Sequence, residues 1–125
     1  PAQYPTMPVR AGTEEHDGYI SLKQDAFLKY FASDVPHDKA MQLFAVQQPI
    51  AKTLFTDRTT AAAWHTKPSW YAVSSQDQTI NPDLERFLAK RMGATTIELP
   101  SSHLSLVSHA KEIADLILAA AGRQP

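Results

Sequence analysis

Asp77 and His103 occupy equivalent places after two predicted strands, where together they could act as an acid–base pair. Asp77 lies four residues beyond Val73, and His103 lies four residues beyond Leu99. Because neighbouring strands are about 4.8 Å apart, side chains on equivalent loops can come within hydrogen-bond reach. A carboxylate that orients an imidazole makes the ring a general base, which takes a hydroxyl proton and later returns it. The spacing therefore indicates the base half of a nucleophilic hydrolase, although a turn-capping Asp77 and a solvated His103 would give the same spacing.

The two strands belong to a predicted strand–helix–strand–helix unit. Residues 70–73 and 95–99 are β-prone runs, and the sequence Asn81-Pro82-Asp83 between them has the cap, the proline and the acidic residue of a helix start. We expect this helix to end at Gly93 and to bury a stripe of Leu84, Phe87, Leu88 and Met92. A last helix is predicted from about Ser108 to Gly122, with an inward stripe of Ala110, Ile113, Ala114, Ile117, Ala120 and Ala121. Since a helical crossover nearly always joins parallel strands, the pattern predicts an α/β fold with a parallel sheet.

Residues 1–63 are predicted to form short amphipathic helices that lie over another part of the structure. Their apolar faces are Phe27, Leu28 and Phe31 in the first helix, Ala40, Met41, Phe44 and Ala45 in the second, and Ile50, Leu54 and Phe55 in the third. Tyr19–Leu22, after the turn signal Asp17-Gly18, is either a short strand or a loop. No run in this segment matches the two buried strands, and a parallel sheet of two strands does not stand alone. The chain is therefore predicted to be one end of a larger α/β sheet.

Charge, hydropathy and cysteine content exclude several classes of protein. The net charge is -1, from 12 Lys and Arg against 13 Asp and Glu, so we expect no nucleic-acid partner. The longest apolar run, residues 116–121, is far shorter than the roughly 20 residues that cross a bilayer, so we expect no membrane span. The absence of cysteine rules out disulfides, thiolate metal sites and a cysteine nucleophile, but it leaves the compartment open, with the cytoplasm slightly favoured.

Only four glycines occur, at positions 12, 18, 93 and 122, so every motif that needs clustered glycine is missing. These motifs are the phosphate loop, the dinucleotide fingerprint and the Gly-x-Ser-x-Gly turn around a nucleophilic serine. We expect no cofactor. We also expect no metal, because Asp77, His103 and His109 do not have a common zinc-binding spacing.

The stretch from Ala63 to Ala121 resembles the carboxyl-terminal end of an α/β-hydrolase. The resemblance is carried by Trp64, the segment Lys67–Val73, Asp77, Ile80-Asn81-Pro82, Arg86, Ala89-Lys90-Arg91, Gly93-Ala94 and Ser102-His103. Upstream, the chain is similar to the helical cap region of cofactor-independent serine hydrolases of this superfamily, through Asp17-Gly18, Phe27, Phe31, Asp34 and Gln48-Pro49. The resemblance covers most of the chain, and it marks the superfamily and one broad branch but no substrate.

The resemblance implies two parts, a helical cap-like segment over residues 1–63 and a carboxyl-terminal strand–helix–strand–helix part over residues 64–125. It implies that Asp77 is the acid and His103 the base of a Ser-Asp-His triad that acts on a small-molecule, ester-like substrate. The serine and the oxyanion-hole loop of the family precede the cap, and this sequence contains neither. We therefore expect the chain alone to be inactive, with the amino-terminal half of the same hydrolase as its partner. The alternative is an inactive fragment or interaction module that docks on that half or forms a homo-oligomer.

Three further side chains, Phe44, Met41 and Trp64, are candidates for the wall of a substrate pocket. They could line an acyl or alcohol site under the cap, although core packing is the commoner role of such residues. A free amino-terminal Pro1 would offer a different base, as in small tautomerases. The Ala-Gln-Tyr-Pro that follows it lacks the alternating strand that would bury such a base.

Overall fold

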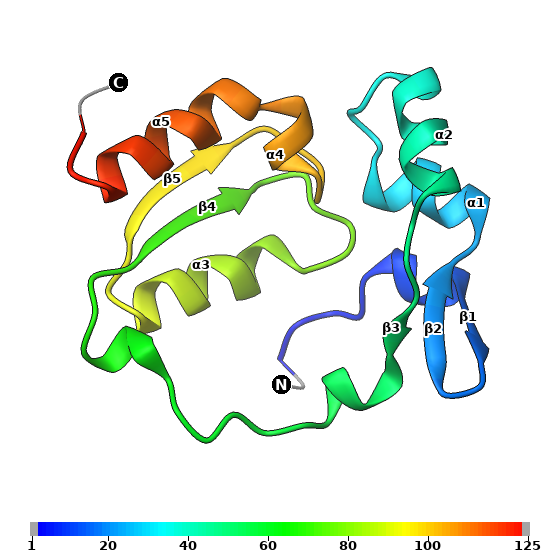
Figure 1. Cartoon of the computed structure of the whole chain (residues 1–125), viewed down its shortest axis with the longest axis horizontal. Coiled ribbons are helices and arrows are strands. Elements are labelled where there is room, and N and C mark those ends of the chain that lie inside the picture. The colour runs from blue at the N-terminus through cyan, green and yellow to red at the C-terminus, as the bar shows by residue number, and fades with distance from the viewer. Residues whose placement is uncertain (1–2, 124–125) are drawn as a thin grey trace.

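The computed structural model describes residues 3–123, and its elements form two groups joined by a long irregular segment (Figure 1). The first group contains β1 (Thr13–His16), β2 (Tyr19–Leu22), α1 (Gln24–Ala26), α2 (His37–Ala45) and β3 (Ile50–Ala51). The second group contains β4 (Trp70–Ser74), α3 (Pro82–Arg91), β5 (Thr95–Leu99), α4 (Ser105–Ser108) and α5 (Ala110–Ala120). Short 3₁₀ or π-helical turns occur at Pro8–Gly12, Phe27–Phe31, Lys52–Phe55 and Ala63–His65. Pro1, the candidate amino-terminal base, lies outside the described residues.

β4 and β5 form a parallel sheet with a helix on either side. Trp70 lies opposite Thr95, and the register continues to Ser74 opposite Leu99. α3 packs against β4, and α5 contacts the same strand from the other side (Figure 1). Both strands point toward the first group, so their carboxyl ends face it. The predicted parallel strand–helix–strand–helix unit is confirmed.

The helix between the two strands, α3, begins where the sequence predicts. The side-chain oxygen of Asn81 accepts the Asp83 amide at 2.9 Å, and Pro82 is the first helical residue. Gly93 follows the helix with a φ of 61°, a conformation that favours glycine. These local signals determine where α3 begins and ends between β4 and β5.

The buried face of α3 differs from the predicted one. Phe87 was expected to point inward, but it is 43% exposed. Glu85 is turned inward instead and is only 4% exposed, because its carboxylate accepts the Ser74 amide at the end of β4. A hydrogen bond to the strand thus outweighs the general preference of glutamate for solvent.

The carboxyl-terminal helix is interrupted, contrary to the prediction of one helix from about Ser108. α4 already starts at Ser105, and α5 follows after a break at His109, which leaves the helical region with φ -125° and ψ 45°. The predicted inward stripe is wrong too, since Ile117 is 61% exposed while Leu116 lies toward β5. The apolar residues of α5 itself lie on most sides of the helix, so their spacing does not single out a buried face.

No helix in the described part of the chain is long and apolar enough to span a membrane.

Residues 50–55 do not form an inward-facing helix, which corrects the third helix predicted for the first group. The first two of them form β3, which pairs with β2 in an antiparallel sheet of order β1-β2-β3. Leu54 and Phe55 follow in a single helical turn and are 62% and 70% exposed. A strand of two residues has no detectable alternation, and its pairing with β2 rather than its own sequence determines the structure.

Tyr19–Leu22 is the strand β2 and not a loop. It pairs with β1 across a two-residue turn, in which Asp17 and Gly18 have φ angles of 49° and 79°. Positive φ at both positions is typical of a type I′ hairpin turn. The first group therefore contains a small antiparallel sheet as well as the helices that the sequence predicts.

The main hydrophobic cluster joins the first group to the region that follows β5. Its buried members are Phe27, Ala32, Val35 and Ala40. Leu104 and Val107, from the second group, pack against these residues. The contact holds the start of α4 against the first group, so the loop between β5 and α4 lies where the two groups meet (Figure 1).

Candidate active site

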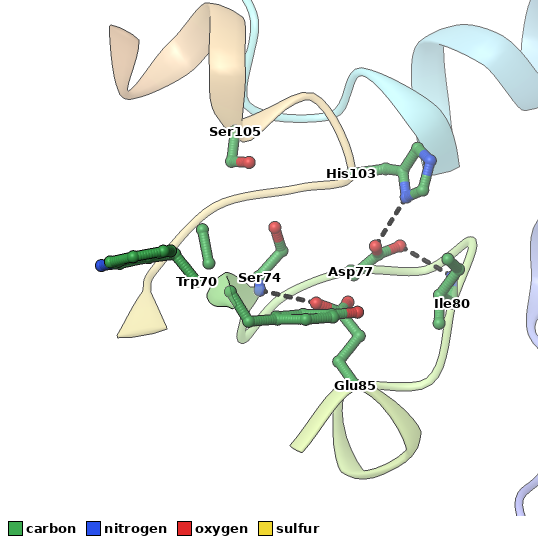
Figure 2. Close-up of a pocket in the computed structure, with 9 residues that line it drawn as sticks. Trp70, Ser74, Asp77, Ile80, Glu85, His103 and Ser105 are labelled. Carbon is green, nitrogen blue, oxygen red and sulfur yellow. Dashed lines mark hydrogen bonds and ion pairs between the residues drawn. The ribbon is translucent and has the colours of Figure 1, made fainter. Parts of the chain in front are cut away.

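Backbone hydrogen bonds hold together the loops that follow β4 and β5. The amides of Ser75 and Gln76 donate to the carbonyls of Leu99 and Ser101, at 2.9 and 3.1 Å. These bonds extend the pairing of the two strands into their loops. The two residues that the sequence analysis singled out therefore come from neighbouring loops that are fixed to one another (Figure 2).

Asp77 and His103 are hydrogen-bonded, with 2.7 Å between Asp77 Oδ2 and His103 Nδ1. The Asp77 side chain is 2% exposed and the His103 side chain 27%. An ionised carboxylate can only accept, so Nδ1 carries the proton and Nε2 keeps a lone pair. Among residues 3–123, no serine hydroxyl is hydrogen-bonded to this ring. The pair can therefore act as a general base toward a hydroxyl that approaches Nε2.

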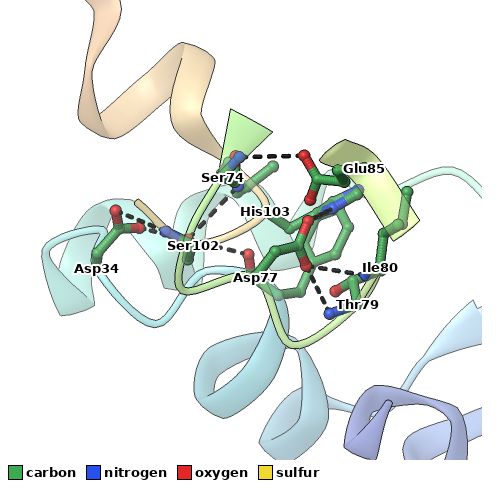
Figure 3. A network of polar contacts seen from close by, with 10 residues as sticks. Asp34, Ser74, Asp77, Thr79, Ile80, Glu85, Ser102 and His103 are labelled. Carbon is green, nitrogen blue, oxygen red and sulfur yellow. Dashed lines mark hydrogen bonds and ion pairs between the residues drawn. The ribbon is translucent and has the colours of Figure 1, made fainter. Parts of the chain in front are cut away.

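The other oxygen of Asp77 is held by the backbone of its own loop. Asp77 Oδ1 accepts the amides of Thr79 and Ile80, at 2.6 and 2.9 Å (Figure 3). Burial disfavours the charged form, but hydrogen bonds from the His103 ring and the two amides outweigh burial and hold the pKa of Asp77 below its ordinary value of 3.8. Asp77 is therefore ionised near neutral pH, as the donor role of His103 Nδ1 requires.

Asp34 and Phe31 anchor the loop that carries His103, and the sequence analysis assigned neither of them to the site. Asp34 Oδ2 accepts the Ser102 amide at 3.0 Å, and Asp34 Oδ1 accepts the Ser102 hydroxyl (Figure 3). The Phe31 ring packs on the imidazole, with 4.9 Å between the ring centroids. Residues of the first group thus hold the backbone immediately before the base and one side of its ring.

Glu85 is another residue near the pair that the sequence analysis missed. Its Oε2 accepts the Ser74 amide at 3.0 Å (Figure 2). Burial, partly offset by that amide, raises the pKa of Glu85 to about 7, and the Asp77 charge adds to the rise. A signal was present, because Glu85 shares a helix face with Leu88 and Met92, at spacings of three and seven residues.

A cavity of about 310 Å³ lies against the pair. Polar side chains form one part of its wall, and these are Ser74, Asp77, Glu85, His103 and Ser105 (Figure 2). Apolar and aromatic residues form the rest, namely Trp70, Tyr71, Ala72 and Ile80. Both predicted catalytic residues therefore border an open space rather than a filled core.

Trp64, a predicted pocket residue, lies away from this cavity. Its ring stacks on His65, and the Arg91 guanidinium lies 5.4 Å from the ring centroid. Arg91 is the last residue of α3, whereas Asp77 precedes the start of that helix. Trp64 comes six residues before β4 and so lies by the start of that strand, at the end opposite to Asp77.

Phe44 and Met41, the other predicted pocket residues, do not line the cavity either. The ring of Phe44 packs edge to face on Phe27, with 5.6 Å between centroids. Met41 Sδ lies 3.6 Å from the Gln24 side-chain nitrogen. In this structure both residues pack within the first group, which was the alternative to a pocket role.

Within residues 3–123, no group of three or more His, Asp or Glu side chains could hold a metal ion. His109, which was considered together with Asp77 and His103, contacts Glu112 instead, with 3.5 Å between His109 Nδ1 and Glu112 Oε1. The break between α4 and α5 directs His109 to that partner. The described residues therefore provide no ligand set for zinc.

Replacement of Asp34 by alanine is expected to destabilise the fold by about 2 kcal/mol, because the buried Ser102 amide loses its acceptor and the Ser102 hydroxyl keeps only its longer bond to the Phe31 carbonyl. Burial disfavours the Asp34 charge, but the bonds from Ser102 outweigh burial and lower the pKa of Asp34 below 3.8. The stabilisation is therefore complete above that value and is lost as the pH falls through the lower pKa of the folded state. Urea unfolding near neutral pH and under acidic conditions measures both effects.

Asp38→Ala is the control for this prediction, since Asp38 is an exposed carboxylate in the first turn of α2. Its free energy of unfolding should change by less than about 0.5 kcal/mol. If Asp34→Ala unfolds at the same urea concentration as this control, Asp34 does not anchor the His103 loop.

A comparison with known protein families covers the same residues. A model of the alpha/beta hydrolase family matches residues 1–116, which include both Asp77 and His103. A search of curated proteins gives no match. The family match spans both groups of elements and not only the strand–helix–strand–helix part.

Proposed function

The chain belongs to the alpha/beta hydrolase family, and from this we propose that it is the carboxyl-terminal portion of a serine-type hydrolase of ester-like, acyl bonds. The observation that carries the proposal is the 2.7 Å hydrogen bond between the buried Asp77 carboxylate and His103 Nδ1. The nucleophilic serine would come from outside these 125 residues, since no serine here has a Gly-x-Ser-x-Gly environment. The polypeptide that carries this chain together with that serine is called the parent protein below.

In the proposed reaction, His103 Nε2 takes the proton of the serine hydroxyl as the serine oxygen attacks the substrate carbonyl carbon. The tetrahedral intermediate then releases the alcohol, which receives that proton from Nε2. Water attacks the acyl-enzyme, His103 takes one proton from the water, and this proton returns to the serine oxygen as the acid leaves. Asp77 keeps Nδ1 protonated and stabilises each imidazolium that forms. These reaction steps require no cofactor.

We propose a small-molecule substrate that residues 1–63 cover. Phe31 supports this proposal, because its ring already contacts His103. Phe44 would act on the substrate space indirectly, through Phe27, which packs on both Phe31 and Phe44. Met41 is half-buried on the same helix as Phe44, and we propose that it borders the substrate space of the parent protein from the cap side, although it does not line the cavity of Asp77 and His103.

The partner proposed for this chain is the amino-terminal half of the same hydrolase. Within residues 3–123, β4 pairs with β5 alone. Strands of a parallel sheet normally have several neighbours and a cover on both faces. One of these two strands would therefore pair, along its second edge, with a strand from the amino-terminal half.

An interaction module without catalytic activity is the second candidate function. A groove of about 410 Å³ runs between β5 and α5, and Trp70, Ile97, Leu99, Leu116 and Ala119 provide its apolar lining. An apolar groove of this kind favours docking on another chain or a second copy of this one. If the groove binds a second copy, analytical ultracentrifugation of the chain would give the mass of a dimer.

The test of the proposed function is hydrolysis of p-nitrophenyl esters of increasing acyl length. The parent protein should turn over at least one ester, whereas this chain alone should be no faster than its own His103→Ala variant, because nucleophile and oxyanion donors supply most of the rate enhancement. The intact mass of the source protein, compared with the 13.8 kDa of this chain, identifies the parent. A parent without activity on any ester, or activity of this chain that needs His103, would contradict the proposal.

A further inference from the structure

Glu85 is a buried carboxyl group that the proposed reaction does not use. It lies in the first turns of α3 and is 4% exposed. Its Oε2 accepts the Ser74 amide, at the end of β4 and three residues before Asp77. Its Oε1 is buried and has no hydrogen-bond partner within residues 3–123. A carboxyl group in this state is costly to bury, which suggests a role beyond packing.

Three titratable groups face Glu85 from the elements around it. Tyr71 comes from β4, Asp77 from the loop after β4 and His103 from the loop after β5, and all three line the same cavity as Glu85 (Figure 2). Burial, together with the charges of Glu85 and Asp77, raises the pKa of Tyr71, so its hydroxyl stays neutral. The charge opposite Glu85 is therefore set by Asp77 and His103.

The neighbouring charged residues on α3 do not face the cavity. Arg86 forms ion pairs with Asp83 and with Glu98 of β5. The side chains of Asp83 and Arg86 are 75% and 42% exposed. Glu85 is thus the charged residue of this helix turn that points toward the Asp77–His103 pair.

We propose that Glu85 is a positioning residue for the Asp77–His103 pair. Glu85 fixes the end of β4 through the Ser74 amide, and it places a second ionisable carboxyl group in the cavity of Asp77. The inference rests on the proposed function. Protonated Glu85 leaves Asp77 as the one negative charge beside the imidazole. Ionised Glu85 adds a second negative charge, which stabilises the protonated imidazole of His103 and so lowers the fraction of the ring in its neutral, basic form.

The pKa of about 7 for Glu85 places this change of charge near neutral pH. The side-chain amide of a Glu85→Gln variant keeps the shape of the side chain and an oxygen that accepts the Ser74 amide, but it cannot ionise. The acid limb of kcat/KM against pH should therefore move to lower pH by about half a unit, because a nearby charge that favours the protonated base is removed. The plateau value of kcat should stay within about threefold of wild type, since the amide at Ser74 keeps its acceptor.

Two further variants separate charge from position. Asp83→Asn removes a negative charge from the exposed face of the same helix turn and should leave the pH profile unchanged. Glu85→Ala leaves the Ser74 amide without an acceptor at the end of β4, so kcat should fall by roughly tenfold or more as Asp77 and His103 lose their alignment.

A readout that does not depend on activity is the urea midpoint of the same parent protein. Wild-type Glu85 has a pKa of about 7 in the folded state against 4.5 when unfolded, so wild type loses stability as the pH rises through 7. The Glu85→Gln variant lacks this loss. The difference in urea midpoint between Glu85→Gln and wild type should therefore increase from mildly acidic to mildly alkaline pH. The corresponding difference for Asp83→Asn should stay constant.

The outcomes distinguish this inference from the proposed function. Suppose that the parent hydrolyses esters and needs His103, while Glu85→Gln has the same pH profile as wild type and a midpoint difference that does not change with pH. In that case the inference is wrong and the proposed function stands. If His103→Ala leaves hydrolysis intact, both are wrong. A shifted acid limb together with the rising midpoint difference supports the inference.

Discussion

His103→Ala is expected to lower kcat of the parent protein on a p-nitrophenyl ester by roughly 10⁴-fold or more. The imidazole is the proposed base at Nε2 and the proposed acid toward the leaving alcohol, so its removal affects both halves of the reaction. The variant keeps the Ser102 anchor to Asp34, and the loop should stay in place. Steady-state kinetics on the parent measure the loss, and circular dichroism confirms that the variant is folded.

His109→Ala is the matched control for this prediction. His109 lies six residues further on, is also partly buried and contacts Glu112. Its kcat should stay within about twofold of wild type, because it does not approach the cavity of the pair. A loss of less than a hundredfold for His103→Ala would remove His103 from the reaction.

Asp77→Asn is expected to lower kcat by about 10⁴-fold near neutral pH while leaving the fold intact. Asn can still accept the Thr79 and Ile80 amides through its oxygen. Its amide group then faces His103 Nδ1 and can only donate, so the ring adopts the tautomer that carries its proton on Nε2. That nitrogen can no longer accept the proton of a serine hydroxyl.

The pH dependence of kcat/KM for Asp77→Asn, measured beside Asp83→Asn, tests this explanation. Asp83 carries the same charge and lies six residues further along the chain, but it is exposed and paired with Arg86. Its replacement should change kcat by less than about twofold. Equal losses in the two variants would mean that the effect of Asp77→Asn is a general loss of charge and not a loss of tautomer control.

Elements with their own start and stop signals could be predicted from the sequence. β5 covers Thr95–Leu99 as expected, and α3 starts after the cap at Asn81, because each signal lies within a few residues of the element that it defines. The contact between Asp77 and His103 follows from the same local signals, since equal offsets from two parallel strands place both residues on neighbouring loops.

Features that depend on distant partners could not be predicted. β3 exists because Ile50 pairs with Ile20, and no pattern in residues 50–55 announces that pairing. The Asp34 carboxylate meets Ser102 across 68 positions of sequence, so its anchoring role becomes visible only in the fold. Glu85 was missed for another reason, because a charged residue on an amphipathic helix is ordinarily assigned to solvent.

The most direct test of the Asp77–His103 pair is the rate at which a p-nitrophenyl ester acylates the parent protein in a single turnover, followed by the release of p-nitrophenol. This step contains the serine attack and the proton transfer to Nε2, and it excludes product release. We predict that acylation slows by at least about a thousandfold in both His103→Ala and Asp77→Asn, and that His109→Ala acylates at the wild-type rate. An acylation rate within tenfold of wild type in either of the first two variants would contradict the assignment of this pair as the acid and base of the hydrolase.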